Sequence, residues 1–171
     1  ADDTAANSGT LTSWSITVCE PLAAPTCPNG NATLTPFQTD FEAGDAGFTH
    51  SGTLDSWARG TPSQAPSFMG CNSGTGCFKT NLSGNYGLSS TQNLVSPAID
   101  LAGLQGPVRL SWAMKYQMES ATFDHASVDI REVGGSSPKR LWEWTGATMQ
   151  TDIGSPVVTV QEVAGWGLYT A

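Results

Sequence analysis

Hydrophobic and polar residues alternate most clearly between residues 108 and 118. The apolar positions of this stretch are Val108, Leu110, Trp112, Met114, Tyr116 and Met118, and Arg109, Ser111, Lys115 and Gln117 stand between them. A period of two is typical of an antiparallel strand with one buried face. Residues 126–131 repeat the pattern. We therefore predict that the side chains of Trp112, Met114, Tyr116, Val128 and Ile130 lie in the core.

Turn-forming residues divide the rest of the chain into short apolar runs. The sequence Val133-Gly-Gly-Ser-Ser-Pro138 predicts a turn before a run at 141–144, so residues 108–144 predict a meander of three strands. Further runs at 37–41, 54–58, 77–82, 93–101 and 156–163 are each bounded by Gly, Pro, Asn or Ser. About eight short strands predict an all-β protein built as a two-sheet antiparallel sandwich.

The N-terminal region reads as a separate element. Residues 10–18 alternate Trp14, Ile16 and Val18 with hydroxyl residues, which predicts one more strand. Residues 20–35 contain several prolines and an Asn-Gly pair, as a linker does. We predict a terminal strand of a preceding β-domain at 1–19, a linker at 20–35 and the main domain at 36–171.

Composition narrows the class of protein. With 39% hydrophobic and 13% charged residues, 19 Gly and 10 Pro, the 171-residue chain is expected to fold and to be rich in turns. A net charge of -8 argues against nucleic-acid and anionic-membrane partners. No run of 18 apolar residues occurs, and Ala1-Asp2-Asp3 lacks the features of a signal peptide, so we expect a mature or excised segment.

The four cysteines form two close pairs in sequence. Four cysteines allow three connectivities, and the spacing favours the local ones, Cys71 with Cys77 and Cys19 with Cys27. The alternatives are four reduced thiols or a zinc site, but the chain has no Cys-x2-Cys element. Two disulfides predict an oxidising compartment, and hence a secreted, extracellular or cell-surface protein.

An ordered series of short motifs carries a family resemblance. The motifs are Asp40-Phe-Glu42, Trp57-Ala-Arg-Gly60, Gly76-Cys-Phe-Lys-Thr-Asn-Leu-Ser-Gly-Asn-Tyr86, Leu94-Val-Ser-Pro97, Ile99-Asp-Leu101 and Asp124-x-Ala-x-Val128. Over residues 36–168 the chain resembles the MAM-like jelly-roll domains appended to secreted bacterial peptidases. The stretch Gly9–Val18 is similar to the last strand of a proprotein-convertase P domain.

The resemblance implies a jelly-roll fold and a non-catalytic binding or structural role. This sequence differs from the family in one respect. The family has one or two more strands after its Gly-Trp-Gly, whereas this sequence ends soon after Gly165-Trp-Gly167. The resemblance therefore leaves open whether the sheet lacks its last strands. An incomplete sheet would invite strand exchange, so an alternative function is an assembly subunit that self-associates through residues 10–18.

The resemblance also implies a metal site. In the family, the Glu of Asp-Phe-Glu and the Asp before the Ala-x-Val strand meet at a cation, and here these are Glu42 and Asp124, with Asp40 and Glu119 as additions. Carboxylates at strand ends together with loop carbonyls suit Ca²⁺, which takes six to eight oxygen ligands. The alternative is a cluster of carboxylates open to water.

Catalytic signatures are absent from the sequence. It has no Gly-x-Ser-x-Gly, His-Glu-x-x-His or phosphate-binding glycine loop. A serine triad would need His50 or His125, and a glycosidase would need a carboxylate pair such as Glu119 with Asp124 or Glu143 with Asp152. We therefore predict a module without catalytic residues, the accessory part of a larger secreted peptidase.

Aromatic side chains are the candidate ligand-stacking residues. They are Trp57, Tyr86, Trp142 and Trp144. Flat rings can stack on sugars, but Trp142 and Trp144 share one face of a strand, and core packing is the favoured interpretation of these two. The sequence thus predicts a calcium-stabilised extracellular module that adheres to a glycan or protein surface.

Overall fold

The computed structural model describes residues 32–66, 68–104, 108–116, 118 and 122–144, and the backbone of 149–150 and 167–170. The chain divides into two compact units, one ending at Thr33 and the other beginning at Leu34. Almost all described residues belong to the second unit. The predicted strand at 10–18, the run at 156–163 and the predicted Cys19–Cys27 pair lie outside the described residues.

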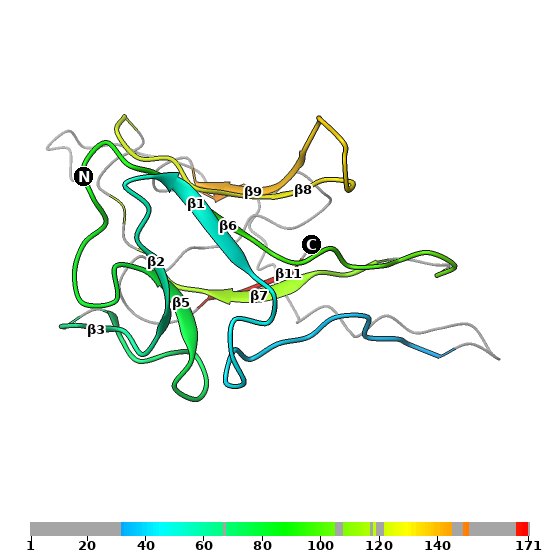
Figure 1. Ribbon diagram of the computed structural model, residues 1–171, viewed down its shortest axis with the longest axis horizontal. Helices are drawn as coiled ribbons and strands as arrows, with labels where there is room; N and C mark the ends of the chain where they lie inside the picture. The colour runs from blue at the N-terminus through cyan, green and yellow to red at the C-terminus, as the bar shows by residue number, and fades with distance from the viewer. Residues whose placement is uncertain are drawn as a thin grey trace, which may run out of the picture. The chain divides into compact units, whose positions relative to one another are not determined.

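Short strands make up all the regular secondary structure of the described residues (Figure 1). They are β1 Thr49–Thr53, β2 Trp57–Gly60, β3 Ser63–Gln64, β4 Phe68–Met69, β5 Cys77–Thr80, β6 Thr91–Val95, β7 Ser111–Met114, β8 Ser127–Ile130, β9 Lys139–Trp144, β10 Met149–Gln150 and β11 Gly167–Thr170. Within the described ranges no helix is long and apolar enough to cross a membrane. The predicted all-β class is confirmed.

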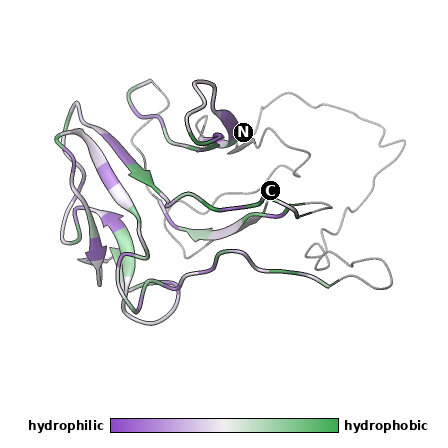
Figure 2. Cartoon of the chain, turned by 45° about the vertical axis from the view of Figure 1, so that its right-hand side comes forward, coloured by the Kyte–Doolittle hydropathy of each residue, from purple (hydrophilic) through white to green (hydrophobic). Residues whose placement is uncertain are grey.

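The strand pairs in the described part of the chain are all antiparallel. The two-stranded sheets are β1–β6, β2–β5, β3–β4 and β7–β11, and β8, β9 and β10 form a three-stranded sheet with β9 in the middle. Hydrophilic and hydrophobic residues are mixed along these strands (Figure 2). This pairing is consistent with a β-sandwich.

The meander predicted for residues 108–144 is wrong in its pairing. Strand β7 pairs with β11, with Met114 opposite Gly167, and does not pair with β8. The third strand of the β8–β9 sheet is β10, which follows β9 through residues 145–148. Alternation identifies a strand and its buried face, but it does not specify the neighbouring strand, because any partner with a buried face can satisfy it.

The prediction of a strand at 37–41 is wrong, because residues 37–40 have no regular secondary structure and the chain turns at residues 41–43. Phe41 has a positive φ of 63°. Its N–H donates to Thr39 Oγ1 at 3.0 Å, and the N–H of Glu42 donates to Asp40 Oδ1 at 3.0 Å. Side-chain acceptors two residues back favour such turns over strands, and this local bonding outweighs the apolar pattern of the run.

The core is built around β9. Leu141, Trp142 and Trp144 are buried there together with Tyr116, which follows β7. The rings of Tyr116 and Trp142 lie 5.7 Å apart between centroids. The partly buried side chains that pack on this cluster include Trp112, Met114 and Val128, three of the predicted core residues. The ring contact of Tyr116 with Trp142 therefore links the segment after β7 to β9.

The prediction for Ile130 is wrong, because its side chain is 45% exposed. The register of β8 against β9 shifts between Val128 and Asp129, as in a β-bulge. Val128 lies opposite Trp142 and Asp129 lies opposite Arg140, so the extra residue of the bulge is Leu141 of β9. Val128 packs on the core beside the buried Trp142, whereas Ile130 ends β8 opposite the exposed Lys139 and is left open to solvent.

Candidate functional site

Four phenylalanine rings position the segment that carries Asp40 and Glu42. Phe41 contacts Phe48 and Phe78 edge-on, at centroid distances of 5.1 and 5.2 Å, and Phe37 lies 6.1 Å from Phe48. Phe78 belongs to β5. Burial of these rings against one another attaches the 37–48 segment to β5 and brings the segment close to the residues that precede this strand.

A disulfide closes the loop that leads into β5. Cys71 and Cys77 are joined, with their Cα atoms 5.7 Å apart, so the pairing predicted from spacing is present. Both sulfur atoms lie against the carbonyl oxygen of Gly60, at 3.6 and 3.7 Å. The hydroxyl of Thr61 donates to the carbonyl of Thr75 at 2.6 Å. The loop is thereby fixed to the end of β2.

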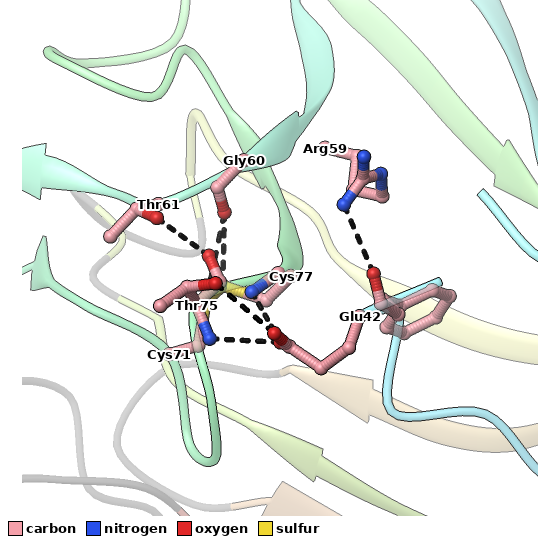
Figure 3. Close-up of a disulfide and its surroundings, with 9 residues drawn as sticks. Glu42, Arg59, Gly60, Thr61, Cys71, Thr75 and Cys77 are labelled. Carbon is pink, nitrogen blue, oxygen red and sulfur yellow. Dashed lines mark hydrogen bonds between the residues drawn. A yellow bond between two sulfur atoms is a disulfide. The ribbon is translucent and has the colours of Figure 1, made fainter. Parts of the chain in front are cut away.

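Glu42 holds the same loop from the other side (Figure 3). Its Oε1 accepts the N–H of Gly76 at 2.5 Å and the N–H of Thr75 at 2.8 Å, and its Oε2 accepts the hydroxyl of Thr75 at 3.1 Å. A Cβ at Gly74 would overlap the Glu42 carboxylate, so the glycine allows the close approach. We call these contacts of Glu42 with Thr75 and Gly76 the Glu42 clasp.

Arg59 adds a further link between β2 and the 37–48 segment. Its Nη1 donates to the carbonyl of Phe41 at 3.0 Å, and its Nε donates to Asp45 Oδ1 at 3.0 Å. The ion pair with Asp45 is solvent-exposed, so we expect it to contribute little by itself. The contact with Phe41 fixes the backbone next to Glu42 and so supports the clasp.

The Glu42 clasp predicts a specific acid response. The N–H groups of Gly76 and Thr75 hold the pKa of Glu42 below its ordinary value of 4.5, because they favour the carboxylate. The clasp therefore contributes stability above the unfolded-state pKa, and the contribution is lost as pH falls from about 4.5 through the lowered folded-state pKa.

We expect amide exchange at Thr75 and Gly76 to be protected at neutral pH and to lose protection in this acid range. Other carboxylates titrate in the same range, so the matched control is Glu42→Gln, whose amide oxygen can accept the same N–H groups but does not titrate, and its protection at these amides should therefore change less with pH. Equal pH dependence in the parent and in Glu42→Gln would contradict the clasp.

The predicted metal ligands lie in different surroundings. Both carboxylate oxygens of Glu42 accept hydrogen bonds from the loop, Asp40 caps the turn before it, and Asp124 accepts the hydroxyl of Tyr86. Glu119 lies outside the described residues. Within the described ranges, no group of three or more His, Cys, Asp or Glu side chains is placed to hold a metal ion.

The calcium site therefore stays a prediction, and a titration tests it. If Glu42 and Asp124 share a Ca²⁺ ion with residues outside the described part, Ca²⁺ should raise the melting temperature by mass action. Asp124→Asn should remove most of that rise. An unchanged melting temperature in Ca²⁺ and in chelator, with no metal found by elemental analysis, would contradict the prediction.

The candidate stacking residues fall into two groups. Trp142 is 1% exposed and Trp144 is 3% exposed. Both rings are therefore core residues and have no free face for a ligand. Trp57 and Tyr86 are half-buried. The indole N–H of Trp57 is itself buried, and the Tyr86 hydroxyl is engaged by Asp124, so the polar end of each ring is directed into the protein.

His50 contacts a nearby carboxylate, and His125 lies at the surface. His50 Nδ1 lies 2.5 Å from Asp55 Oδ2, and Asp55 Oδ1 accepts the N–H of Trp57. This hydrogen bond from His50 is the main reason that the pKa of Asp55 lies below its ordinary value. His125 is exposed, whereas Asp124 beside it is half-buried. Of the carboxylates weighed for a glycosidase pair, Glu143 contacts Arg140 at 2.5 Å, and Asp152 lies outside the described residues.

Comparison with known proteins yields one relationship with part of a larger protein. Over 110 residues, 64% of this chain, the sequence is 34% identical to Bacillopeptidase F from Bacillus subtilis (strain 168). The chain spans about 7% of the length of that relative. No family model matches the sequence. No solved structure matches it significantly. The match relates this chain to a segment of a protein named as a peptidase.

Proposed function

We propose that this chain is a non-catalytic accessory module of a larger secreted peptidase, and that it adheres to a glycan or protein surface. The observation that carries the proposal is the partial match to Bacillopeptidase F, which relates most of this chain to a small fraction of that protein. A segment of this size suits an appended β-sandwich of the MAM-like jelly-roll type better than a peptidase domain. The disulfide at Cys71–Cys77 agrees with an extracellular location.

The loop between the two cysteines is the part of the described surface that best suits binding. Asn72, Ser73 and Gly74 are exposed, and the disulfide and the Glu42 clasp fix both sides of the loop. A loop that is ordered before binding loses less conformational entropy when a ligand docks. We therefore propose residues 72–75 as the binding surface and call them the adhesive rim. Glu42 contacts this loop directly, and Arg59 fixes the backbone next to Glu42.

Two assays on the full chain test this function. Incubation with insoluble peptidoglycan, cellulose, chitin and collagen, followed by sedimentation, should deplete the chain from solution on at least one surface. Incubation with casein should release no peptides above the level of a heat-denatured sample. If none of the four materials depletes the chain from solution, adhesion to a surface is contradicted. Cleavage of casein by the purified chain would contradict a non-catalytic module.

A further inference from the structure

The backbone turn that follows β5 surrounds a positive charge. Lys79 Nζ donates to the carbonyl oxygens of Thr80 at 3.0 Å, Asn81 at 2.6 Å and Gly84 at 2.8 Å. The three N–H donors of an ammonium thus each have a backbone acceptor. The same nitrogen lies 5.2 Å from the centroid of the Phe68 ring, at cation–π distance.

The turn is shaped to direct its carbonyl groups inward. Asn81 has a positive φ of 51°, which few residues other than glycine adopt. Its side chain holds this conformation, because the amide donates to the carbonyl of Asn85 at 2.7 Å and its oxygen accepts the N–H of Ser83 at 3.4 Å. The N–H of Gly84 closes the turn on the carbonyl of Asn81 at 3.3 Å. Three carbonyl dipoles aimed at one point would repel one another without a cation between them.

We propose that the turn 80–84 and the ring of Phe68 form a binding site for a monovalent cation of about the size of ammonium or potassium, and that the ammonium group of Lys79 occupies it in this chain. The donor set is neutral and made of backbone carbonyls, the groups with which proteins replace the hydration shell of potassium. Ca²⁺ fits it poorly, because its ligands lie at about 2.3–2.6 Å and usually include carboxylates. The contacts from Thr80 and Gly84 are longer than this range.

Burial and hydrogen bonding act on the charge of Lys79 in opposite directions. Lys79 is half-buried, and burial lowers the pKa of its amine from the ordinary value of 10.5. Hydrogen bonds from the ammonium to three carbonyls oppose this shift, because they favour the charged form. A tethered ammonium needs no cation from solution, so the turn that leads to Asn85 and Tyr86 should keep its shape whatever salt is present.

Replacement of Lys79 by alanine in the full chain tests the proposal. Melting temperatures are compared at constant ionic strength in the chlorides of N-methylglucamine, which is too large for the turn, and of potassium, ammonium, sodium and calcium. The parent should melt at the same temperature in N-methylglucamine and potassium. Lys79→Ala should melt several degrees lower than the parent in N-methylglucamine, and this difference from the parent in the same salt should shrink in potassium or ammonium more than in sodium or calcium.

Two further variants separate the charge from the packing of the side chain. Lys79→Met keeps a long apolar stem that fills the space without a charge, so it should melt low in every salt. Ser83→Ala leaves the three carbonyl acceptors in place and should behave as the parent does.

A Lys79→Ala variant that potassium and ammonium do not stabilise, or that stays unfolded in every salt, would overturn the cation site. A Lys79→Met variant as stable as the parent would overturn it as well, because the stem and not the charge would then support the turn.

Discussion

Replacing Trp142 by alanine is expected to lower the free energy of unfolding by about 3–5 kcal/mol, the range for large aromatic residues in cores. Trp142 is the largest fully buried side chain among the described residues, and it packs on the ring of Tyr116. Its removal loses apolar burial and leaves a cavity at the centre of β9. Chemical denaturation followed by tryptophan fluorescence and circular dichroism measures the loss.

The matched control for this prediction is Phe123→Ala. Phe123 is an aromatic side chain that is 71% exposed, so its removal should change the free energy of unfolding by no more than about 0.5 kcal/mol. Equal losses in the two variants would mean that β9 does not form the centre of the core. If Trp142→Ala fails to fold, Trp142→Phe should give a smaller loss that can still be measured.

The second large effect is expected from removal of the Cys71–Cys77 disulfide by replacing both residues with alanine. The loop that it closes is short, so the loss should lie near the low end of the range of roughly 2–4 kcal/mol for disulfides. Mutation is preferable to a reducing agent, which would also act on a Cys19–Cys27 bond. Thermal and urea denaturation under non-reducing conditions gives the difference from the parent.

The disulfide and the Glu42 clasp act on the same loop, so their effects should not add. Both limit the motion of residues 72–76, one through a covalent bond and one through hydrogen bonds to Thr75 and Gly76. In a double-mutant cycle, Glu42→Gln should therefore cost a different amount in the parent than in the chain that carries Cys71→Ala and Cys77→Ala. Strict additivity would show that the clasp and the disulfide stabilise separate parts of the protein.

Local patterns predict much of this fold, and non-local pairing accounts for what they miss. Alternation locates β7, β8 and β9 to within a few residues and places Tyr116 and Val128 at the core. Strand β7 pairs with β11, which is distant in sequence, and the alternation of residues within β7 does not indicate its partner. The bulge at Leu141 of β9 has no glycine or proline to mark it, and the exposure of Ile130 depends on its place at the end of β8 opposite Lys139, which alternation does not specify.

The candidate site shows the same division. Close spacing predicts the Cys71–Cys77 pair, and Asp-Phe-Glu directs attention to Glu42. The sequence gives no sign that Glu42 bonds the backbone of Thr75 and Gly76, because backbone donors leave no residue-type signature. The contacts of Arg59 and Lys79 with backbone carbonyls were missed for the same reason. Only the glycines of the 72–76 loop hint at a close approach.

The most direct test of the proposed function is a depletion isotherm of the full chain on the insoluble surface that retains it best. The parent is compared with a rim variant that carries Asn72→Ala and Ser73→Ala, two exposed positions outside the Glu42 clasp, after equal melting temperatures have been established. A binding module predicts saturable retention of the parent and at least about tenfold weaker binding of the rim variant, or 1.4 kcal/mol. Superimposable isotherms for the two chains would contradict a binding rim at the disulfide loop, and linear retention without saturation would contradict a specific surface-binding module.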